Sequence, residues 1–271
     1  MVDRCRALHF DGHPCGHSVL GTIQSIDALT AEQMREYFNR RYAPNNMVVA
    51  FTGKLEWEQV SRIVEQNCAE RSSEDVGRKL EDCPGSKKQE RIEKPNLVRE
   101  HICLISPAPS AQSEERFAAS VFATIVGDDV GSRFFWRLVD KALAETATMQ
   151  FAGMDGTGML CSYIRCSNEN KQEVLEEVRQ IFGELSNKGV AEEELRAAKN
   201  KLLSAFVLKN ELPMGRLVDL GFNWVYLGQY RPTAEDIEAI KAVTVADINA
   251  LVEQFNPGDF TLLSMGPGGT S

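Results

Sequence analysis

The sequence contains no apolar run of the roughly 20 residues that a membrane-spanning helix needs. Its densest apolar stretches, Met47–Phe51 and Leu202–Leu208, have the length of core elements. The N-terminal residues Met1–Arg6 carry charges with no apolar stretch after them, unlike a secretory signal peptide. We therefore expect neither a membrane span nor a signal peptide.

The sequence also has no excess of positive charge. Its 271 residues include 30 Lys and Arg against 39 Asp and Glu, a formal net charge of −9. Nucleic-acid-binding proteins concentrate Lys and Arg against phosphates, and docking on anionic lipid needs basic residues. We therefore expect no nucleic acid and no membrane among the partners. The 43% hydrophobic and 25% charged residues are typical of a globular protein.

Cys-x-x-Cys motifs are missing too. The seven cysteines are an odd number, are widely spaced, and in several cases lie in apolar patterns where a free thiol behaves as a small hydrophobic group. This usage favours a reducing compartment over a disulfide framework. The cytoplasm is the predicted location.

What the chain does contain falls into three zones. Residues 1–70 begin with a His-, Gly- and Pro-rich loop and continue as a helix, a strand over Met47–Phe51 and a helix ending at Cys68. Residues 71–96 are charged, contain Pro and Gly and have few apolar anchors, which predicts a linker. Residues 97–271 combine strand and helix patterns, which predicts a complete α+β domain.

The third zone supplies the clearest element boundaries. Strands are predicted over Leu97–Ser106, Thr146–Ala152, Met159–Cys166 and Phe260–Met265, with a hairpin turn at Asp155-Gly156. Helices are predicted over about Glu114–Val126 and Ser132–Ala142, up to Lys188-Gly189, over about Ala191–Leu208, and after Pro213, Thr233 and Thr244.

An internal repeat links the first zone to the third. Residues 26–53 and 240–266 each read as a capped helix, a Pro-containing turn and an apolar strand. A domain repeated at this spacing predicts that residues 1–70 are the C-terminal part of a first domain and that residues 97–271 are a complete second copy. The alternative is a chance match of two short helix-turn-strand units.

Several short motifs occur in a definite order along the chain. The first zone holds His13–Thr22, Leu29-Thr30 and Tyr42–Met47. The third holds Pro107–Pro109, Val126-Gly127, Gly131–Phe135, Leu143-Ala144, Asp155–Gly158, Gly189-Val190, Glu192–Leu195 and Ala198-Lys199. Together they resemble the M16 peptidase family, which includes pitrilysin, insulinase and the mitochondrial processing peptidase, over nearly the whole chain.

The resemblance implies a LuxS/processing-peptidase-like α+β domain, with a mixed, largely antiparallel sheet packed against helices, and a partial copy of the same domain at the N-terminus. It further implies the C-terminal, substrate-chamber portion of a zinc metalloendopeptidase that hydrolyses peptides. The missing N-terminal half, a partner subunit or a second copy in a homodimer would then be the partner. Two alternatives stay open: a non-catalytic scaffold or partner subunit of an M16-type heteromer, and an unrelated α+β binding protein.

The zinc motif of the family is not found in this chain. Members hold Zn²⁺ with a His-x-x-Glu-His helix, whose Glu acts as general base on the metal-bound water, and with a later Glu. None of the four histidines begins such a motif; they are His9, His13, His17 and His101. We therefore expect no catalytic residue, no metal ligand and no cofactor in this chain, with zinc in the parent protein, and we expect the chain alone to be inactive.

Two groupings imitate a metal motif. The first three histidines recur every four residues, but Gly12, Pro14 and Gly16 lie between them and oppose an α-helix, which favours a packed loop. The alternative is adventitious metal binding together with Cys5 or Cys15. The pair Glu100-His101 would need a histidine at position 97, where Leu97 stands on a predicted strand.

Many family members also hold substrate with an Arg and a Tyr of the second domain. Where a Gly-Leu-Ala-Tyr pattern would lie, this sequence reads Ala142–Glu145, so that Glu145 replaces the Tyr. Arg137 and Lys141 are nearby, but neither is a clear counterpart of the Arg. We therefore assign no substrate-binding residue and interpret the segment as a helix end with solvated charges. The alternative is a changed specificity, in which Glu145 faces basic peptide residues.

Three further features have structural interpretations. Gly127–Gly131 could be a phosphate-binding loop, but its two carboxylates and lack of Lys would repel an anion. Glu192–Glu194 is predicted to complement a helix dipole. Trp224 and Tyr226 are predicted to lie in a core or an interface.

A partial domain in the first zone would leave strand edges and an apolar helix face uncovered. We therefore expect Met47–Phe51 to be an edge strand that pairs across a dimer or docks on the second domain.

Overall fold

The structure is a computed structural model that describes residues 1–68, 77 and 80–268. The chain divides into two compact units, each built from separate stretches of sequence. The first unit combines Met1–His17, Glu81–Ala205 and the chain from Ala234 onward, and the second combines the described parts of Ser18–Leu80 with Phe206–Thr233. In the described residues, no helix is both long enough and apolar enough to cross a membrane.

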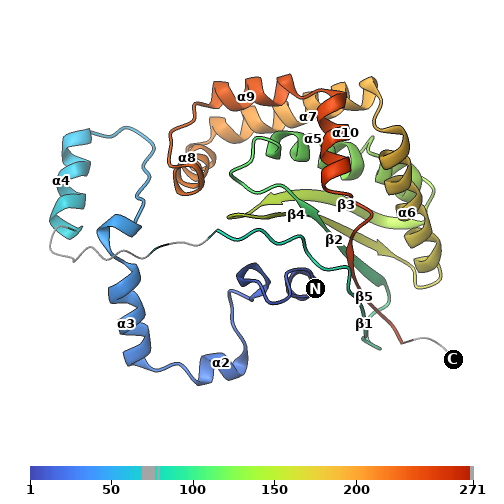
Figure 1. Cartoon of the computed structure of the whole chain (residues 1–271), viewed down its shortest axis with the longest axis horizontal. Coiled ribbons are helices and arrows are strands. Elements are labelled where there is room, and N and C mark those ends of the chain that lie inside the picture. The colour runs from blue at the N-terminus through green and yellow to red at the C-terminus, as the bar shows by residue number, and fades with distance from the viewer. Residues whose placement is uncertain (69–76, 78–79, 269–271) are drawn as a thin grey trace. The chain divides into compact units, whose positions relative to one another are not determined.

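The first unit is built on a five-stranded mixed sheet with the strand order β1-β5-β2-β4-β3 (Figure 1). β1 runs parallel to β5, and the other neighbouring strands are antiparallel. The strands are β1 (Gln89–Glu93), β2 (Glu100–Ala108), β3 (Ala144–Gly153), β4 (Gly158–Cys166) and β5 (Thr261–Gly266). This arrangement confirms the α+β class with a largely antiparallel sheet packed against helices.

The predicted hairpin joins β3 and β4. Gly153 pairs with Gly158, and the register runs back to Ala144 opposite Cys166. Gly156 has a φ of +76°, a backbone conformation that glycine adopts without the steric cost of a Cβ. The Asp155-Gly156 signal therefore marked the turn correctly.

Successive residues of β2 face two different cores, because side chains alternate across a strand. Ile102 and Leu104 belong to the main core, whereas Cys103 and Ile105 belong to a smaller core on the opposite face. Helices α5, α6 and α10 and the first part of α7 cover the main-core face (Figure 1). Helix α1 packs on β2 and β5 and covers part of the other face.

The helices of the first unit carry the expected end signals. Thr244 forms a capping box with Asp247, and Gly189 ends its helix with a φ of +70°. These helices are α1 (Val2–His9), α5 (Arg116–Gly127), α6 (Lys171–Lys188), α7 (Glu192–Glu211, extending into the second unit), α9 (Thr233–Ala242) and α10 (Val245–Gln254), with short turns η1 (Pro14–Gly16) and η3 (Phe135–Val139).

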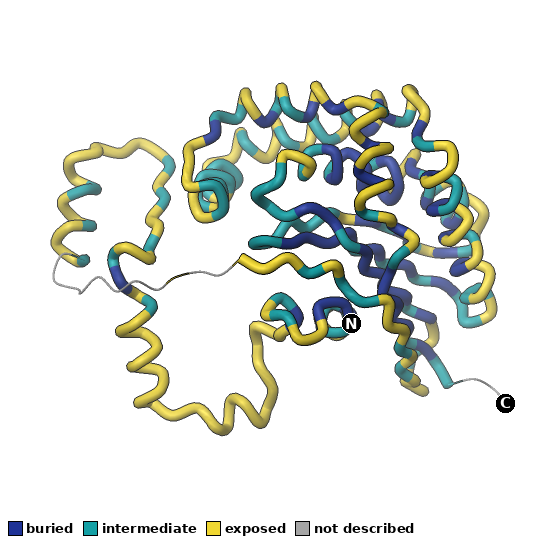
Figure 2. Tube along the Cα trace, in the orientation of Figure 1, coloured by how far each residue is buried: buried dark blue, intermediate teal, exposed yellow. Residues whose placement is uncertain are grey.

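The second unit is helical and has almost no core. Thr30 and Gln33 form a capping box, in agreement with the capped helix expected within residues 26–53, yet the helix that they begin buries none of its residues. Figure 2 shows this helix exposed along its length. The elements are α2 (Ile23–Asp27), α3 (Ala31–Arg41), η2 (Pro44–Asn46), α4 (Trp57–Cys68) and α8 (Pro213–Leu227).

The strand predicted over Met47–Phe51, and with it the proposed edge strand, is wrong. These residues form no strand and are half-buried or exposed. A strand is defined by hydrogen bonds to a neighbouring strand, and in the described part of the second unit no strand is present to pair with this segment. An apolar run alone is therefore not enough to predict a strand.

Other differences concern element ends. The strand predicted from Leu97 begins at Glu100, and it continues through Pro107. The helix predicted over Ser132–Ala142 is a short segment that contains the π-turn η3. Helix α1 was not predicted. Strand β1 lies within the stretch predicted as a linker, 71–96, of which residues 71–76 and 78–79 lie outside the described residues.

The helix and the turn of the internal repeat occur in both copies, but the strand occurs in only one. In both copies a capping-box threonine, Thr30 or Thr244, begins a helix that leads to a Pro-containing turn. Only the second copy continues into a strand, β5, because there β1 and β2 lie on either side to pair with it.

Candidate functional site

The histidine at the end of α1 is buried among hydroxyl and backbone groups. His9 is 1% exposed, and its Nδ1 lies 3.0 Å from Thr261 Oγ1. Its carbonyl accepts a hydrogen bond from the Ser86 amide at 2.8 Å. A Cβ on Gly85 would lie 2.2 Å from the ring, so the glycine makes room for the imidazole. Burial lowers the pKa of His9 from 6.5 to about 4, which keeps the ring neutral at pH 7.

The other histidines lie elsewhere. His13 Nδ1 accepts a hydrogen bond from the Cys15 amide at 3.2 Å, and His17 follows the same turn at the surface. His101, on β2, places Nδ1 2.7 Å from the Tyr163 hydroxyl. The prediction that the first three histidines lie in one packed loop is correct only in part: His9 is the last residue of α1, and His13 and His17 follow in the loop, half-buried and exposed. The three histidines share no helix face. The described residues contain no group of three or more His, Cys, Asp or Glu that could hold a metal ion.

A buried carboxylate lies at the centre of an ion network in the first unit. The Glu100 side chain is fully buried, and its Oε1 accepts hydrogen-bonding contacts from Arg91 Nη1 at 2.8 Å and Lys171 Nζ at 2.9 Å. Lys171 also lies 3.0 Å from Ser264 Oγ. This network joins β1, β2, β5 and the start of α6. No sequence signal pointed to it, because its members come from four separate elements.

The segment expected to hold substrate in the family has a different arrangement here. Glu145 lies on β3, not at a helix end, and forms ion pairs with Arg99 and with Arg165, the latter at 2.9 Å. The two guanidinium groups lower the pKa of the Glu145 carboxyl, the hydrogen bond from Arg99 being the largest cause. A carboxylate already held by two arginines is a poor partner for a basic peptide residue. Arg137 pairs with Glu177 on α6 at 2.7 Å.

The backbone just before this glutamate is strained. Ala142 has a φ of +57° and is the one non-glycine residue of the described chain with a positive φ. The resemblance places a glycine of the family at this position. A left-handed backbone costs alanine roughly 1 kcal/mol more than glycine, so a glycine would be favoured at this position.

We expect Ala142→Gly to raise the free energy of unfolding by about 0.5–1 kcal/mol, despite the greater freedom that glycine has in the unfolded chain. Urea denaturation at pH 7 measures this change. Ala147→Gly on β3, where the backbone is extended, is the matched control and should destabilise. If both glycine variants lose stability, the strain at Ala142 is not relieved by substitution.

The remaining charged motifs have structural roles. Glu194 accepts two hydrogen bonds from Arg133, at 2.8 and 2.9 Å, and one from the Ala191 amide at the start of α7. In the Gly127–Gly131 loop, the Asp128 carboxylate is paired with Lys201 at 2.6 Å. Lys201, on α7, thus supplies the cation that pairs with this loop.

The second unit presents the largest apolar surface of the molecule. In the described residues, every exposed large hydrophobic side chain belongs to this unit, apart from Val2, Val98, Val130 and Trp136. Helix α8 contributes Phe222, which is 55% exposed. The prediction that Trp224 and Tyr226 lie in a core is wrong, because Trp224 is 51% exposed and Tyr226 is only half-buried; the alternative of an interface stays a prediction. Monomeric proteins rarely leave so many large apolar side chains in water.

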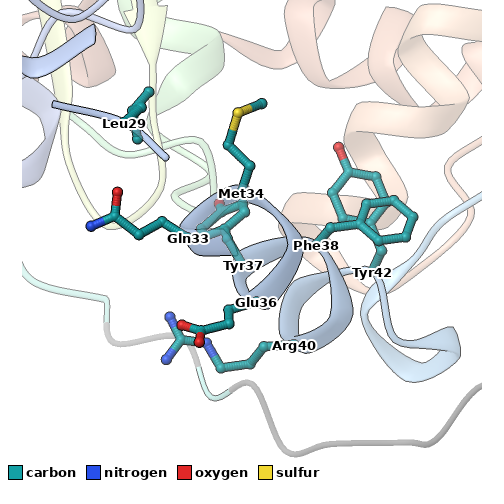
Figure 3. A pocket seen from close by; sticks show the side chains of 8 residues that line it. All are labelled: Leu29, Gln33, Met34, Glu36, Tyr37, Phe38, Arg40 and Tyr42. Carbon is teal, nitrogen blue, oxygen red and sulfur yellow. The ribbon is translucent and has the colours of Figure 1, made fainter. Parts of the chain in front are cut away.

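Helix α3 forms the centre of one part of this surface. Met34, Phe38 and Tyr42 follow one another at helical spacing along one side, while Glu36 and Arg40 lie on the opposite side (Figure 3). The Phe38 and Tyr42 rings stack with centroids 4.5 Å apart. They line a hollow of about 670 Å³. None of the residues of this helix is buried in the structure.

Comparison with known proteins identifies a family with this architecture. Residues 28–202 match the family described as "Peptidase M16 inactive domain". The chain is 27% identical to an uncharacterized zinc protease of Mycobacterium leprae, over 98% of this chain and 61% of that protein. It is 23% identical to the mitochondrial-processing peptidase subunit beta of Dictyostelium discoideum, over 92% of this chain and 55% of that protein.

Solved structures have the same fold. The crystal structure of a peptidase M16 inactive domain from Pseudomonas fluorescens superposes with a TM-score of 0.89 at 20% identity, covering 99% of this chain and 65% of the other. A chain of Complex III2 from Candida albicans superposes with a TM-score of 0.88 at 17% identity, covering 98% of this chain and 66% of the other. This chain thus spans about three fifths of the length of the zinc protease that it matches.

Proposed function

This chain belongs to the peptidase M16 family, and we propose that it is the C-terminal, substrate-chamber portion of a zinc metalloendopeptidase that hydrolyses peptides. The observation that supports this most directly is the match to the M16 inactive domain across residues 28–202. The similarity to zinc proteases over nearly the whole chain supports it further.

Zinc does not fit the residues that the structure describes. The described residues have no cluster of three ligands, His9 packs against a hydroxyl, and His101 bonds to a tyrosine. The metal and the activated water therefore belong, in this proposal, to a part of the parent protein outside the present sequence. This portion would supply a wall of the chamber and contacts to the peptide.

The domain division follows from the same proposal. Residues 1–70 would be the end of a first M16-like domain, residues 71–96 a linker and residues 97–271 a second domain. The exposed apolar side chains of α3 support this division, because a partial domain leaves its core side chains uncovered. A missing N-terminal half or a partner subunit would cover them, in the reducing cytoplasm that seven free thiols favour.

We expect the isolated chain to bind no stoichiometric zinc and to cleave no peptide. Metal analysis of the purified chain and a fluorogenic peptide assay with and without EDTA measure both properties. One zinc per chain together with EDTA-sensitive hydrolysis would defeat the proposed division of labour.

A second candidate is a non-catalytic scaffold or partner subunit of an M16-type heteromer. The similarity to a processing-peptidase subunit and to a Complex III2 chain favours it. The two candidates differ in what the transcript encodes before Met1. An in-frame His-x-x-Glu-His more than a hundred residues upstream supports the peptidase, whereas a degenerate upstream domain supports the scaffold.

The apolar face of α3 should drive association of the isolated chain, including with a second copy. We expect Phe38→Asp to raise the dissociation constant for self-association at least tenfold, because burial of a Phe side chain is worth about 1.5–3 kcal/mol. Sedimentation velocity over a concentration series measures this. Arg35→Asp, on the same exposed helix but outside the hollow, should have a much smaller effect. Equal effects of both substitutions would show that charge and not the apolar face matters.

A further inference from the structure

The segment of chain just before β1 lies against the end of α1. Residues 81–88, which we call the strap, follow the first stretch of the second unit in the sequence and lead into β1. The Ser86 amide donates a hydrogen bond to the His9 carbonyl at 2.8 Å, and the Leu262 amide of β5 donates one to the Lys88 carbonyl at 2.9 Å. The strap is thus fastened to both α1 and β5.

The hydrogen bonds around Thr261 assign the tautomer of His9. Thr261 Oγ1 donates its hydrogen to the Ser86 carbonyl, so the same oxygen accepts in the bond to His9 Nδ1, 3.0 Å away, and Nδ1 carries the ring hydrogen. The neutral ring then has a bare lone pair at Nε2. Among the described residues, none offers Nε2 a hydrogen-bond partner, and the whole side chain is buried.

Gly85 of the strap covers this bare nitrogen. A Cβ on Gly85 would lie 2.3 Å from His9 Nε2 and 2.2 Å from the ring carbon Cε1, so the strap backbone passes directly against this edge of the ring. Gly85 also has a φ of +76°, a conformation that glycine adopts without the steric cost of a Cβ. A hydrogen added at Nε2 would therefore meet the strap in a buried place that offers no acceptor, which is costly for a charged group.

We propose that His9 is a pH-dependent switch for the strap: protonation at Nε2 releases residues 81–88 from α1 while the five-stranded sheet stays folded. The proton comes from solvent, and the new N–H needs an acceptor, which water supplies once Gly85 has moved away. Nδ1 carries a hydrogen in both charge states, so its bond to Thr261 need not break. Return of the proton to solvent closes the strap again.

The charged groups around His9 do not stabilise the imidazolium while the strap is closed. The elements in contact with His9 carry three ion pairs, which are Asp3–Arg6 on α1, Asp11–Lys88 between the loop after α1 and the strap, and Asp259–Lys87 between the turn before β5 and the strap. The other ionisable residues of these elements are Arg4, Cys5, His13, Cys15, Glu81, Asp82 and Cys83. None of these groups is a hydrogen-bond partner of Nε2. Burial therefore outweighs the hydrogen bond with the Ser86 backbone and lowers the pKa of His9 to about 4.

A proton-NMR titration of the histidine ring signals of the full chain tests the switch. We expect His9 to titrate near pH 4 in the wild type and near pH 6.5 in Gly85→Ala, because a Cβ at this position cannot lie against the ring. Gly12→Ala is the matched control, since Gly12 has a similar φ of +78° but a Cβ there meets no atom within 4 Å. A wild-type His9 that titrates near pH 6.5, or the same His9 pKa in both alanine variants, would overturn the proposal.

Hydrogen exchange follows the strap itself. With a His9 pKa of about 4 in the closed state and 6.5 in the open state, exchange of the Ser86 amide, corrected for its intrinsic rate, should accelerate about 70-fold between pH 7.5 and pH 4.5. His9→Gln should abolish this acceleration. His13→Gln should keep it, although the His13 ring also contacts the strap, at the Glu81 carbonyl. Equal acceleration in wild type and His9→Gln would contradict the assignment to His9.

The urea dependence of exchange separates release of the strap from unfolding of the sheet. Sensitivity to urea scales with the surface that opening exposes, so local opening responds weakly and global unfolding steeply. At pH 4.5 we expect a small slope for the amides of residues 81–88 and a steep one for those of β2. Equal slopes would show that the strap opens only together with the sheet, against the proposal. These measurements involve neither zinc nor peptide cleavage, so this inference and the proposed function fail independently.

Discussion

Replacing Glu100 by alanine is expected to lower the free energy of unfolding by about 3–5 kcal/mol, the range seen when one partner of a buried ion pair is removed. The carboxylate is fully buried, and its loss leaves the Arg91 guanidinium and the Lys171 ammonium without their shared partner. The Lys171 side chain is 21% exposed and the Arg91 side chain 32%, so water compensates the ammonium less than the guanidinium. Denaturant unfolding of the full chain at pH 7 measures the change.

The chain offers a matched control at Glu145. This carboxylate also has two cationic partners, Arg99 and Arg165, but it lies at the surface. Exposed ion pairs contribute little, because solvent and salt screen them. Glu145→Ala should therefore leave the unfolding midpoint almost unchanged. Similar losses in the two variants would mean that burial does not govern the strength of these networks.

The second large effect is a loss of stability in acid that depends on His9. The pKa of His9 is about 4 in the folded chain, whereas an unperturbed histidine, as in the unfolded chain, has a pKa of 6.5. The unfolded chain therefore binds the proton more readily. The contribution of the neutral His9 side chain to the free energy of unfolding is complete above pH 6.5, and it is lost as the pH falls from 6.5 to 4. Between pH 7 and pH 4.5 the loss attributable to His9 is about 2–3 kcal/mol.

Urea unfolding at the two pH values, compared between wild type and His9→Gln, isolates this effect. Carboxylates also titrate in this interval, but they are common to both proteins and cancel in the difference. His17→Gln, at an exposed position in the following turn, should show the wild-type dependence. A His9→Gln variant with the same loss as the wild type would show that the imidazole is not responsible.

Local signals in the sequence were enough for most helices and for the hairpin. Thr30 with Gln33, Thr244 with Asp247 and the glycine at 189 mark helix ends through hydrogen bonds and dihedral angles that lie within a few residues. The order of short motifs was also enough to identify the M16 family, which the match over residues 28–202 confirms.

Pairing and burial depend on residues far apart in the chain, and there the sequence was insufficient. Met47–Phe51 has the composition of a strand but lies unpaired, whereas the polar segment Gln89–Glu93 becomes β1 because β5 lies beside it. Glu100 looked like one half of a false metal motif, and only the sheet and α6 together show it as the centre of a buried ion network. Cys103 and Cys161, 58 positions apart, meet because the β2–β4 register brings them together. Hydrogen bonds within one turn can be read along the chain, but contacts between strands require the folded arrangement.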